Sequence, residues 1–187
     1  NGRGMDPRLV ERAQRGDEAA FAAITQANHV RLKQTAYRIL RDRHLAEDAA
    51  QGALVEMWRS LPKLRDVDRF EAWSYRILVH ACYRESKRHR RWLGQLQSLS
   101  EPTAPDGTGP VNDRDQLERG FADLSIDHRA VVVLHYYLDL TIEDTAAALG
   151  ISFGTAKSRL HRAMAKLRVA LHADSPATDK PRPESAP

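Results

Sequence analysis

Apolar residues recur every three or four positions along most of the chain, with polar residues between them. This is the spacing of one face of an α-helix, which turns once in about 3.6 residues. It occurs at Leu32, Ala36 and Ile39, at Leu54, Met57 and Leu61, at Phe70, Trp73 and Ile77, at Leu117, Phe121 and Leu124, and at Val131, Leu134 and Leu138. The run at 131–134 contains three β-branched valines, which favour a strand, but no partner strand or hairpin turn is near it. The pattern predicts an all-α protein.

Two stretches interrupt this helical pattern. Residues 100–110 and 174–187 are dense in Pro, Gly and small polar residues, which bury too little apolar surface to hold a fold. We therefore predict two small helical domains, at 11–93 and 116–173, joined by a flexible acidic linker at 94–115. A disordered start is expected at 1–10 and a disordered tail at 174–187. The four residues before Met5 have the character of a cloning remnant.

Composition excludes several classes of protein. The longest apolar run among the 187 residues, 19–24, is six residues long, whereas a membrane helix needs about 20. No secretion signal opens the chain, and a single cysteine, Cys82, excludes an internal disulfide. We expect a cytoplasmic protein that is neither secreted nor membrane-spanning.

Charge is distributed in blocks, although the net charge of +4 is small. Residues 75–92 hold six Lys or Arg against one acid, Glu85, and residues 153–171 hold five against none. Between these blocks, residues 93–122 hold five acids against two bases. Two basic patches therefore flank an acidic middle, a distribution that favours binding to nucleic acid more than the total charge does.

The C-terminal half has the signals of a helix-turn-helix. Thr141 and Asp144 form a capping box for a short helix, Gly150 can take the positive φ that ends it, and Ser152 caps the next helix. A helix-turn-helix places its second helix in the DNA major groove. We assign Lys157 and Arg162 mainly to phosphates, and Thr155, Ser158 and Arg159 to base edges. The alternative is a packed helical hairpin with a solvated basic face, which the five bases without an acid disfavour.

The turn and second helix of this predicted helix-turn-helix resemble those of a known family. Residues 150–163, GISFGTAKSRLHRA, are similar to the recognition helix of region four in extracytoplasmic-function (ECF) sigma factors. Residues 46–51, AEDAAQ, followed by Trp58, resemble the part of sigma region two that docks on the polymerase clamp, and residues 70–77, FEAWSYRI, resemble its promoter-melting part. The resemblance spans about residues 16–171, with both motif sets in the family's order.

The resemblance implies an alternative sigma factor that binds RNA polymerase core, recognises the −35 and −10 promoter elements and helps to open the −10 region. The implied core-polymerase residues are Asp48, Gln51 and Trp58. The implied −10 residues are Arg65, Arg69, Trp73, Tyr75, Arg76, His80, Arg84, Lys87, Arg88 and Arg91, and those for the −35 element are Ser152, Thr155, Lys157, Ser158, Arg159 and Arg162. An anti-sigma factor is an implied partner, and the free chain is expected to be a monomer. Family members often carry Asn at the place of His80 and Asp at that of Arg84, so the −10 base preference stays open.

Each assignment has a plainer alternative. Trp58 and Trp73 sit at helical spacing with other apolar residues and could be core, and Asp48 and Gln51 could lie on an ordinary solvated face. Cys82 and its neighbouring histidines have no partner cluster, so neither a metal nor a cofactor is expected. No catalytic motif is present, which disfavours a nucleic-acid enzyme. A stand-alone helix-turn-helix regulator, which would bind a palindromic site without polymerase, is the other rival.

Overall fold

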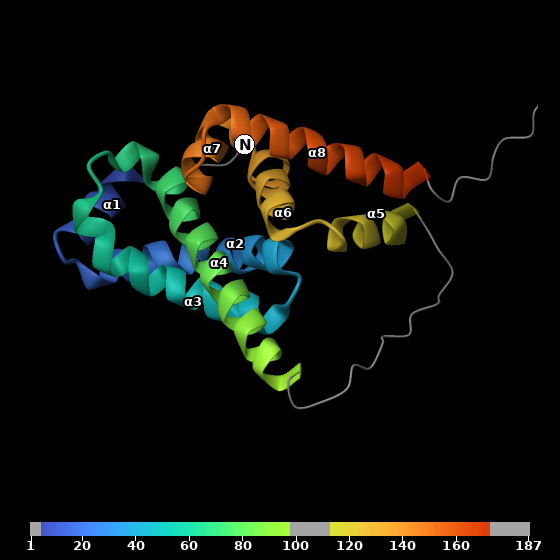
Figure 1. The fold of residues 1–187 in the computed structure, drawn as a ribbon. Helices are drawn as coiled ribbons and strands as arrows, with labels where there is room; N and C mark the ends of the chain where they lie inside the picture. Colours follow the sequence, from blue (N-terminus) through green and yellow to red (C-terminus); the bar gives the residue numbers. More distant parts are fainter. Residues whose placement is uncertain (1–4, 98–112, 173–187) are drawn as a thin grey trace, which may run out of the picture.

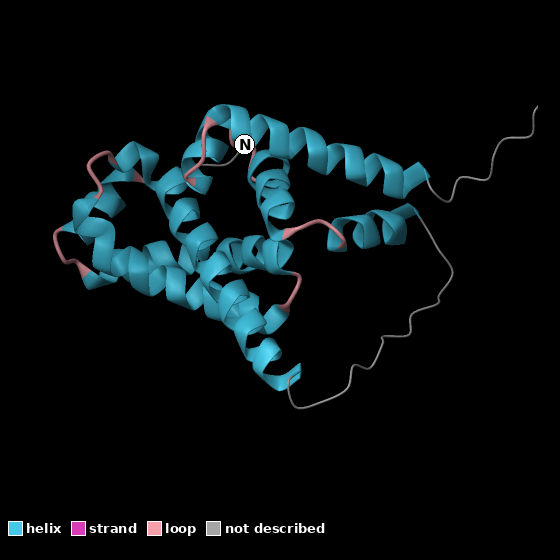
Figure 2. Ribbon diagram, viewed as in Figure 1, coloured by secondary structure: helices cyan, strands magenta, loops and turns pink. Residues whose placement is uncertain are grey.

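The computed structural model describes residues 5–97 and 113–172. Within those ranges every regular element is a helix and no strand occurs, as Figure 2 shows, so the predicted all-α class is confirmed. The elements are α1 (Pro7–Gln14), α2 (Glu18–Leu40), α3 (Arg43–Ser60), η1 (Leu61–Lys63), η2 (Val67–Arg69), α4 (Phe70–Gln97), α5 (Asp113–Ala122), α6 (Ile126–Val132), η3 (Val133–Tyr137), α7 (Ile142–Leu149) and α8 (Phe153–His172).

The N-terminal half is a bundle of α2, α3 and α4, with α1 packed on one end of α2 (Figure 1). Aspartates cap the N-termini of α2 and α3: Asp17 accepts a hydrogen bond from the Ala20 amide at 2.9 Å, and Asp42 accepts one from the Leu45 amide at 2.9 Å. Such caps satisfy amides that have no partner inside the helix. Arg41, in the left-handed region at φ 62°, ends α2 and turns the chain into α3.

Residues 7–10 belong to helix α1, so the prediction of a disordered start is wrong for these residues. Asp6 caps the helix by accepting a hydrogen bond from the Arg8 amide at 3.0 Å, and Pro7 occupies its first turn, where no amide hydrogen is needed. Val10 and Ala13 are buried in a small cluster with α2. Gln14 donates hydrogen bonds to the carbonyls of Leu61 and Leu64, at 3.1 and 2.7 Å. The helix therefore also fixes the turn that follows α3.

In the C-terminal half, α5 and α6 both pack on α8. Gly120 of α5 is buried against α8, where a Cβ atom added to it would lie 2.6 Å from the Ala170 Cβ. The valine-rich run is helical: α6 continues into the π-helical turn η3, so the strand alternative is wrong. The ends of the predicted linker, 94–97 and 113–115, belong to α4 and α5. Its remaining residues, 98–112, and the whole of the predicted tail, 174–187, lie outside the described ranges.

The two halves pack against each other. Helix α7 lies on α4, and α6 and η3 lie on α2 (Figure 1). One buried cluster of apolar side chains runs through both halves, from Leu32 and Leu78 to Leu134 and Leu167. Arg129 of α6 adds a polar link, because its Nε donates to the carbonyl of Ile39 at 2.6 Å. We call this packing the closed arrangement.

Candidate nucleic-acid and protein interfaces

Helix α3 presents a mixed polar and apolar stripe to solvent. Asp48, Gln51 and Trp58 are all exposed and, with Val55, follow one another at helical spacings of three, four and three residues. This spacing places them on one face. Val55 is 48% exposed and Trp58 is 38% exposed, so two large apolar side chains face water together. We call these four residues the docking stripe.

Trp58 is neither wholly core nor wholly surface. Its ring packs against Phe21 of α2 with a centroid distance of 4.8 Å, while the rest of the side chain is open. The sequence interpretation missed Val55, although an apolar residue seven positions after Asp48 carries the signal of that face. Asp48 is engaged within the chain, because its Oδ2 accepts a hydrogen bond from Arg88 Nη2 of α4 at 3.0 Å.

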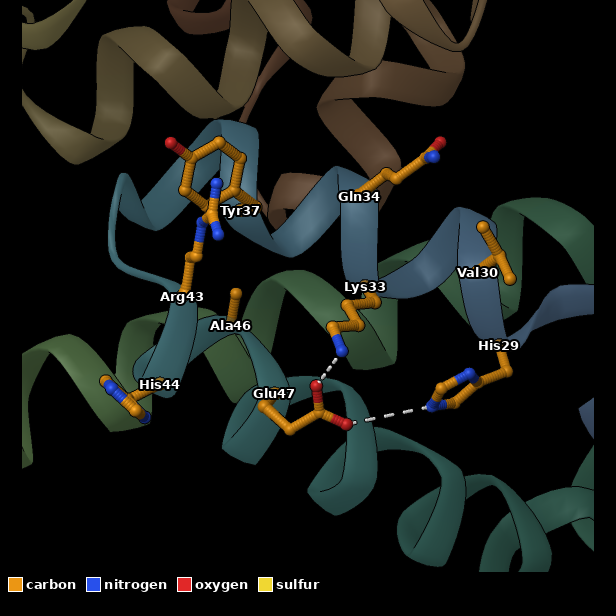
Figure 3. A pocket seen from close by; sticks show the side chains of 9 residues that line it. All are labelled: His29, Val30, Lys33, Gln34, Tyr37, Arg43, His44, Ala46 and Glu47. Atoms are coloured by element: carbon orange, nitrogen blue, oxygen red, sulfur yellow. Dashed lines mark ion pairs between the residues drawn. The ribbon is translucent and has the colours of Figure 1, made fainter.

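A hollow of about 660 Å³ lies between α2 and α3, next to the docking stripe (Figure 3). Glu47 forms ion pairs there with Lys33 and, at 3.8 Å, with His29, both from α2. The Lys33 ammonium lowers the pKa of the Glu47 carboxyl, because its hydrogen bond favours the charged form. These contacts tie α3 to α2 and so fix the orientation of the helix that carries Asp48.

Helix α4 carries a basic stripe on one exposed face. Its members are Arg76, His80, Arg84, Lys87 and Arg91, all of them exposed. Their positions lie within about 80° of one another around the helix. Arg65 and Arg69 are also exposed, on the segment that leads into α4, and Arg69 lies 3.6 Å from Asp144 of α7. Arg88 pairs with Glu85 at 2.6 Å as well as with Asp48. Trp92, 54% exposed, follows Arg91 and was not among the predicted residues.

Two aromatic residues predicted to meet DNA are packed inside. Tyr75 is 2% exposed and lies in the main buried cluster, 5.4 Å from the Arg31 guanidinium. Burial raises the pKa of its hydroxyl to about 12. Trp73 is partly buried between the two apolar clusters, with its ring 5.6 Å from that of Phe70. Tyr75 would have to leave the core to stack on a base, so we withdraw it from the DNA-contacting set, and Trp73 contributes packing.

The predicted helix-turn-helix signals act as expected in α7 and α8. Thr141 Oγ1 accepts a hydrogen bond from the Asp144 amide at 3.0 Å, and its hydroxyl donates to the Asp144 carboxylate at 2.9 Å. Gly150 takes φ 66° and ends α7. Ser152 Oγ then accepts from the Thr155 amide at 3.2 Å and caps α8. Ala156, fully buried, lets α8 approach its neighbours closely.

The start of α8 presents a polar face, which we call the reading face. It comprises Ser152, Thr155, Ser158, Arg159 and Arg162, whose positions lie within about 60° of Thr155. Lys157 is exposed but lies about 200° around the helix from Thr155, and so is not part of this face. A lysine on the side of α8 away from the reading face fits the predicted phosphate contact better than a contact with base edges.

Arg159 is engaged within the C-terminal half. Its Nη1 lies 3.4 Å from Asp127 Oδ1 of α6, and its side chain is 27% exposed. The same carboxylate oxygen accepts a hydrogen bond from the Tyr83 hydroxyl of α4 at 2.7 Å. Asp127 therefore joins a residue of the reading face to the helix that carries the basic stripe.

The described residues contain neither a metal site nor a membrane-spanning helix. Across 5–97 and 113–172, no three His, Cys, Asp or Glu side chains lie close enough together to hold a metal ion. In the same ranges no helix combines the length and hydrophobicity that crossing a membrane requires.

Comparisons with known proteins agree with this geometry. A sigma-70 region 2 model matches residues 24–92 and a sigma-70 region 4 model matches residues 114–167. The ECF RNA polymerase sigma factor SigL of Mycobacterium tuberculosis is 31% identical, over 87% of this chain and 94% of its own. Among solved structures, CnrH in complex with the cytosolic domain of CnrY matches 91% of this chain and 99% of its own, with 27% identity and a TM-score of 0.64. The sigma factor RpoE of Bartonella quintana, in complex with the anti-sigma factor NepR, matches 83% and 98%, with 25% identity and a TM-score of 0.66.

The chain therefore belongs to the ECF family of RNA polymerase sigma factors. The predicted resemblance is confirmed, and with it the function of an alternative sigma factor, which is promoter recognition in transcription initiation. The region 2 match covers most of α2 to α4, with the docking stripe and the basic stripe, and the region 4 match covers α5 to most of α8, with the reading face.

Proposed function

We propose that the docking stripe of α3 is the surface that binds the clamp of RNA polymerase core. The supporting observation is the pair of exposed apolar side chains, Val55 and Trp58, beside the exposed polar Asp48 and Gln51. Apolar anchors with a polar rim are the usual composition of a protein interface, and Trp is enriched among the residues that dominate binding energy. Asp48 supplies the charge that would have to leave Arg88 to meet a basic partner.

For the −10 element we propose the basic stripe of α4, together with Arg65, Arg69 and Arg88. Cations along one helix face match the regular negative charge of a DNA backbone. Trp73 supports this surface from below by packing on Phe70, and Tyr75 belongs to the core. For these roles the predicted domains at 11–93 and 116–173 extend to whole helices, and we propose 7–97 as the polymerase and −10 unit and 113–172 as the −35 unit.

For the −35 element we propose the reading face of α8. Small hydroxyl side chains at the start of a recognition helix, followed by two arginines, suit direct contact with base edges in the major groove. Lys157 would hold a phosphate. We also propose that the chain is a monomer that works in the cytoplasm and has no catalytic activity of its own. We further propose that an anti-sigma factor restrains it, because the similar sigma factor RpoE of Bartonella quintana forms a complex with the anti-sigma factor NepR.

The −35 assignment is tested in holoenzyme by comparing two variants on a promoter library randomised at −35. Arg159→Ala should relax the preference at one base pair, at a cost of about 1–3 kcal/mol, if Arg159 contacts a base. Lys157→Ala should weaken binding to all sequences about equally, since a phosphate contact carries no base information. An unchanged base preference in Arg159→Ala would reject the assignment.

A further inference from the structure

Arg88 of α4 lies between the surface proposed for polymerase and the surface proposed for −10 DNA. Its Nη2 is 3.0 Å from Asp48 Oδ2 in the docking stripe and 2.6 Å from Glu85 Oε2, three residues earlier on α4. Its position is about 40° around the helix from that of Arg84 in the basic stripe. One guanidinium nitrogen therefore contacts two carboxylates, while the residue itself borders the basic stripe.

The two carboxylates that contact Arg88 differ in their access to a partner. The Asp48 side chain is 52% exposed, whereas the Glu85 side chain is 14% exposed and its Oε2 is buried. A cation on another protein can therefore reach Asp48 but not Glu85. Because a buried carboxylate is costly to leave without a counter-charge, Glu85 keeps Arg88 at α4 when Asp48 meets a partner.

The roles proposed for Asp48 and Arg88 compete with the contact between them. In the free chain each residue neutralises the other, so Asp48 is not fully available to a basic partner and Arg88 is not fully available to a phosphate. Breaking this one contact makes both residues available. If one partner breaks it, the other no longer has to, and linkage requires each partner to raise the affinity for the other by the same factor.

We propose that Arg88 is a positioning residue that couples polymerase binding to −10 DNA binding through an exchange of ion pairs. When the polymerase takes Asp48, Arg88 keeps its contact with Glu85 and turns toward a DNA phosphate. The exchange rests on the functions proposed above for the docking stripe and the basic stripe. Its size is limited by the Asp48–Arg88 ion pair, and exposed pairs of this kind change a binding constant by about 1.5- to 5-fold.

The exchange can be tested on the full chain with two dissociation constants for each variant. The first is for the chain with core polymerase, by fluorescence anisotropy, and the second is for the holoenzyme with a forked −10 DNA. Arg88→Ala should tighten core binding about threefold, because Asp48 is then already available. It should weaken forked-DNA binding about tenfold, because one charged contact is lost. A purely structural role for Arg88 would weaken both.

The matched control is Arg84→Ala, which removes an exposed cation of the basic stripe outside the cluster of Asp48, Arg88 and Glu85. This variant should weaken forked-DNA binding about as much as Arg88→Ala does, and should leave core affinity unchanged. The comparison separates the exchange of ion pairs from a general loss of positive charge on α4.

Glu85→Gln tests the second carboxylate with little change in side-chain size. Once the charge of Glu85 is removed, Arg88 holds Asp48 more tightly, so core binding should weaken about twofold. In the double variant with Arg88→Ala, the Glu85→Gln substitution should have no further effect on core affinity, because it acts through Arg88.

A core affinity of Arg88→Ala that is equal to or lower than that of the wild type overturns the exchange, even if forked-DNA binding falls. That result leaves both proposed surfaces standing. Forked-DNA binding that is unchanged in both Arg84→Ala and Arg88→Ala instead contradicts the role proposed for the basic stripe, and the exchange is then overturned with it.

Discussion

Replacing Trp58 with Ala tests the docking stripe through the area that a partner would cover. Trp58 is 38% exposed. For a side chain that offers about 250 Å², this leaves about 95 Å² open to a partner. At about 25 cal/mol per Å², covering that area is worth at most about 2.4 kcal/mol, or about fiftyfold in Kd. Because association also has costs, we expect Trp58→Ala to weaken binding to core polymerase by about ten- to fiftyfold, measured by fluorescence anisotropy.

The same substitution removes the packing of Trp58 on Phe21, which should lower the free energy of unfolding by about 2–3 kcal/mol. This is less than the loss of about 3–5 kcal/mol that follows when a fully buried aromatic residue is replaced by Ala. Urea unfolding checks that the variant stays folded. Trp92→Ala is the matched control, because Trp92 is 54% exposed on α4 and outside the docking stripe. Equal affinities of the wild type and Trp58→Ala, or equal losses in the two variants, would refute the reasoning.

Two further predictions concern the core. Gly120→Ala places a Cβ atom 2.6 Å from the Ala170 Cβ, where ordinary contact begins at 3.4 Å, so α5 must move from α8 by about 0.8 Å. We expect the free energy of unfolding, measured in urea, to fall by about 1–3 kcal/mol. An unchanged unfolding midpoint would contradict the close approach. Burial raises the pKa of the Cys82 thiol to about 12, so at pH 8 the native thiolate is about a thousandfold scarcer than for an ordinary cysteine. A thiol reagent should label Cys82 only on unfolding. The contribution that the protonated Cys82 thiol makes to the free energy of unfolding should decline as pH rises from about 9 toward 12. Rapid labelling of the native chain would show that Cys82 is not buried.

Local signals in the sequence predicted the helix-turn-helix well, because each of its features needs only neighbouring residues. Thr141 and Ser152 cap the helices that follow them, and Gly150 takes the positive φ between them. Helical spacing likewise predicted that Asp48 and Gln51 share a face. These features are decided within one or two turns of a helix, where the sequence itself contains both partners.

Features that depend on distant partners were not predictable in this way. Spacing cannot tell which side of α4 meets other helices, so Tyr75 was assigned to DNA although it is 2% exposed. Helix α1 is only eight residues long, and its buried Val10 and Ala13 pack in a cluster with Leu61 and Phe70, which lie far along the chain. The closed arrangement depends on pairs such as Tyr83 with Asp127, 44 residues apart, and Tyr137 with Gln34, 103 apart. No local pattern records such pairs.

The central claim, that this chain is a polymerase subunit acting through α3, is tested most directly by gel filtration with bacterial core RNA polymerase. The wild type should co-elute with core at a one-to-one ratio, and Asp48→Arg should not, because the substitution reverses the charge in the docking stripe and faces Arg88 with a like charge. Glu11→Arg, a charge reversal at an exposed position of α1, is the matched control and should co-elute like the wild type. Failure of the wild type to bind core, together with tight binding of the free chain to a palindromic duplex, would contradict the claim and favour a stand-alone helix-turn-helix regulator.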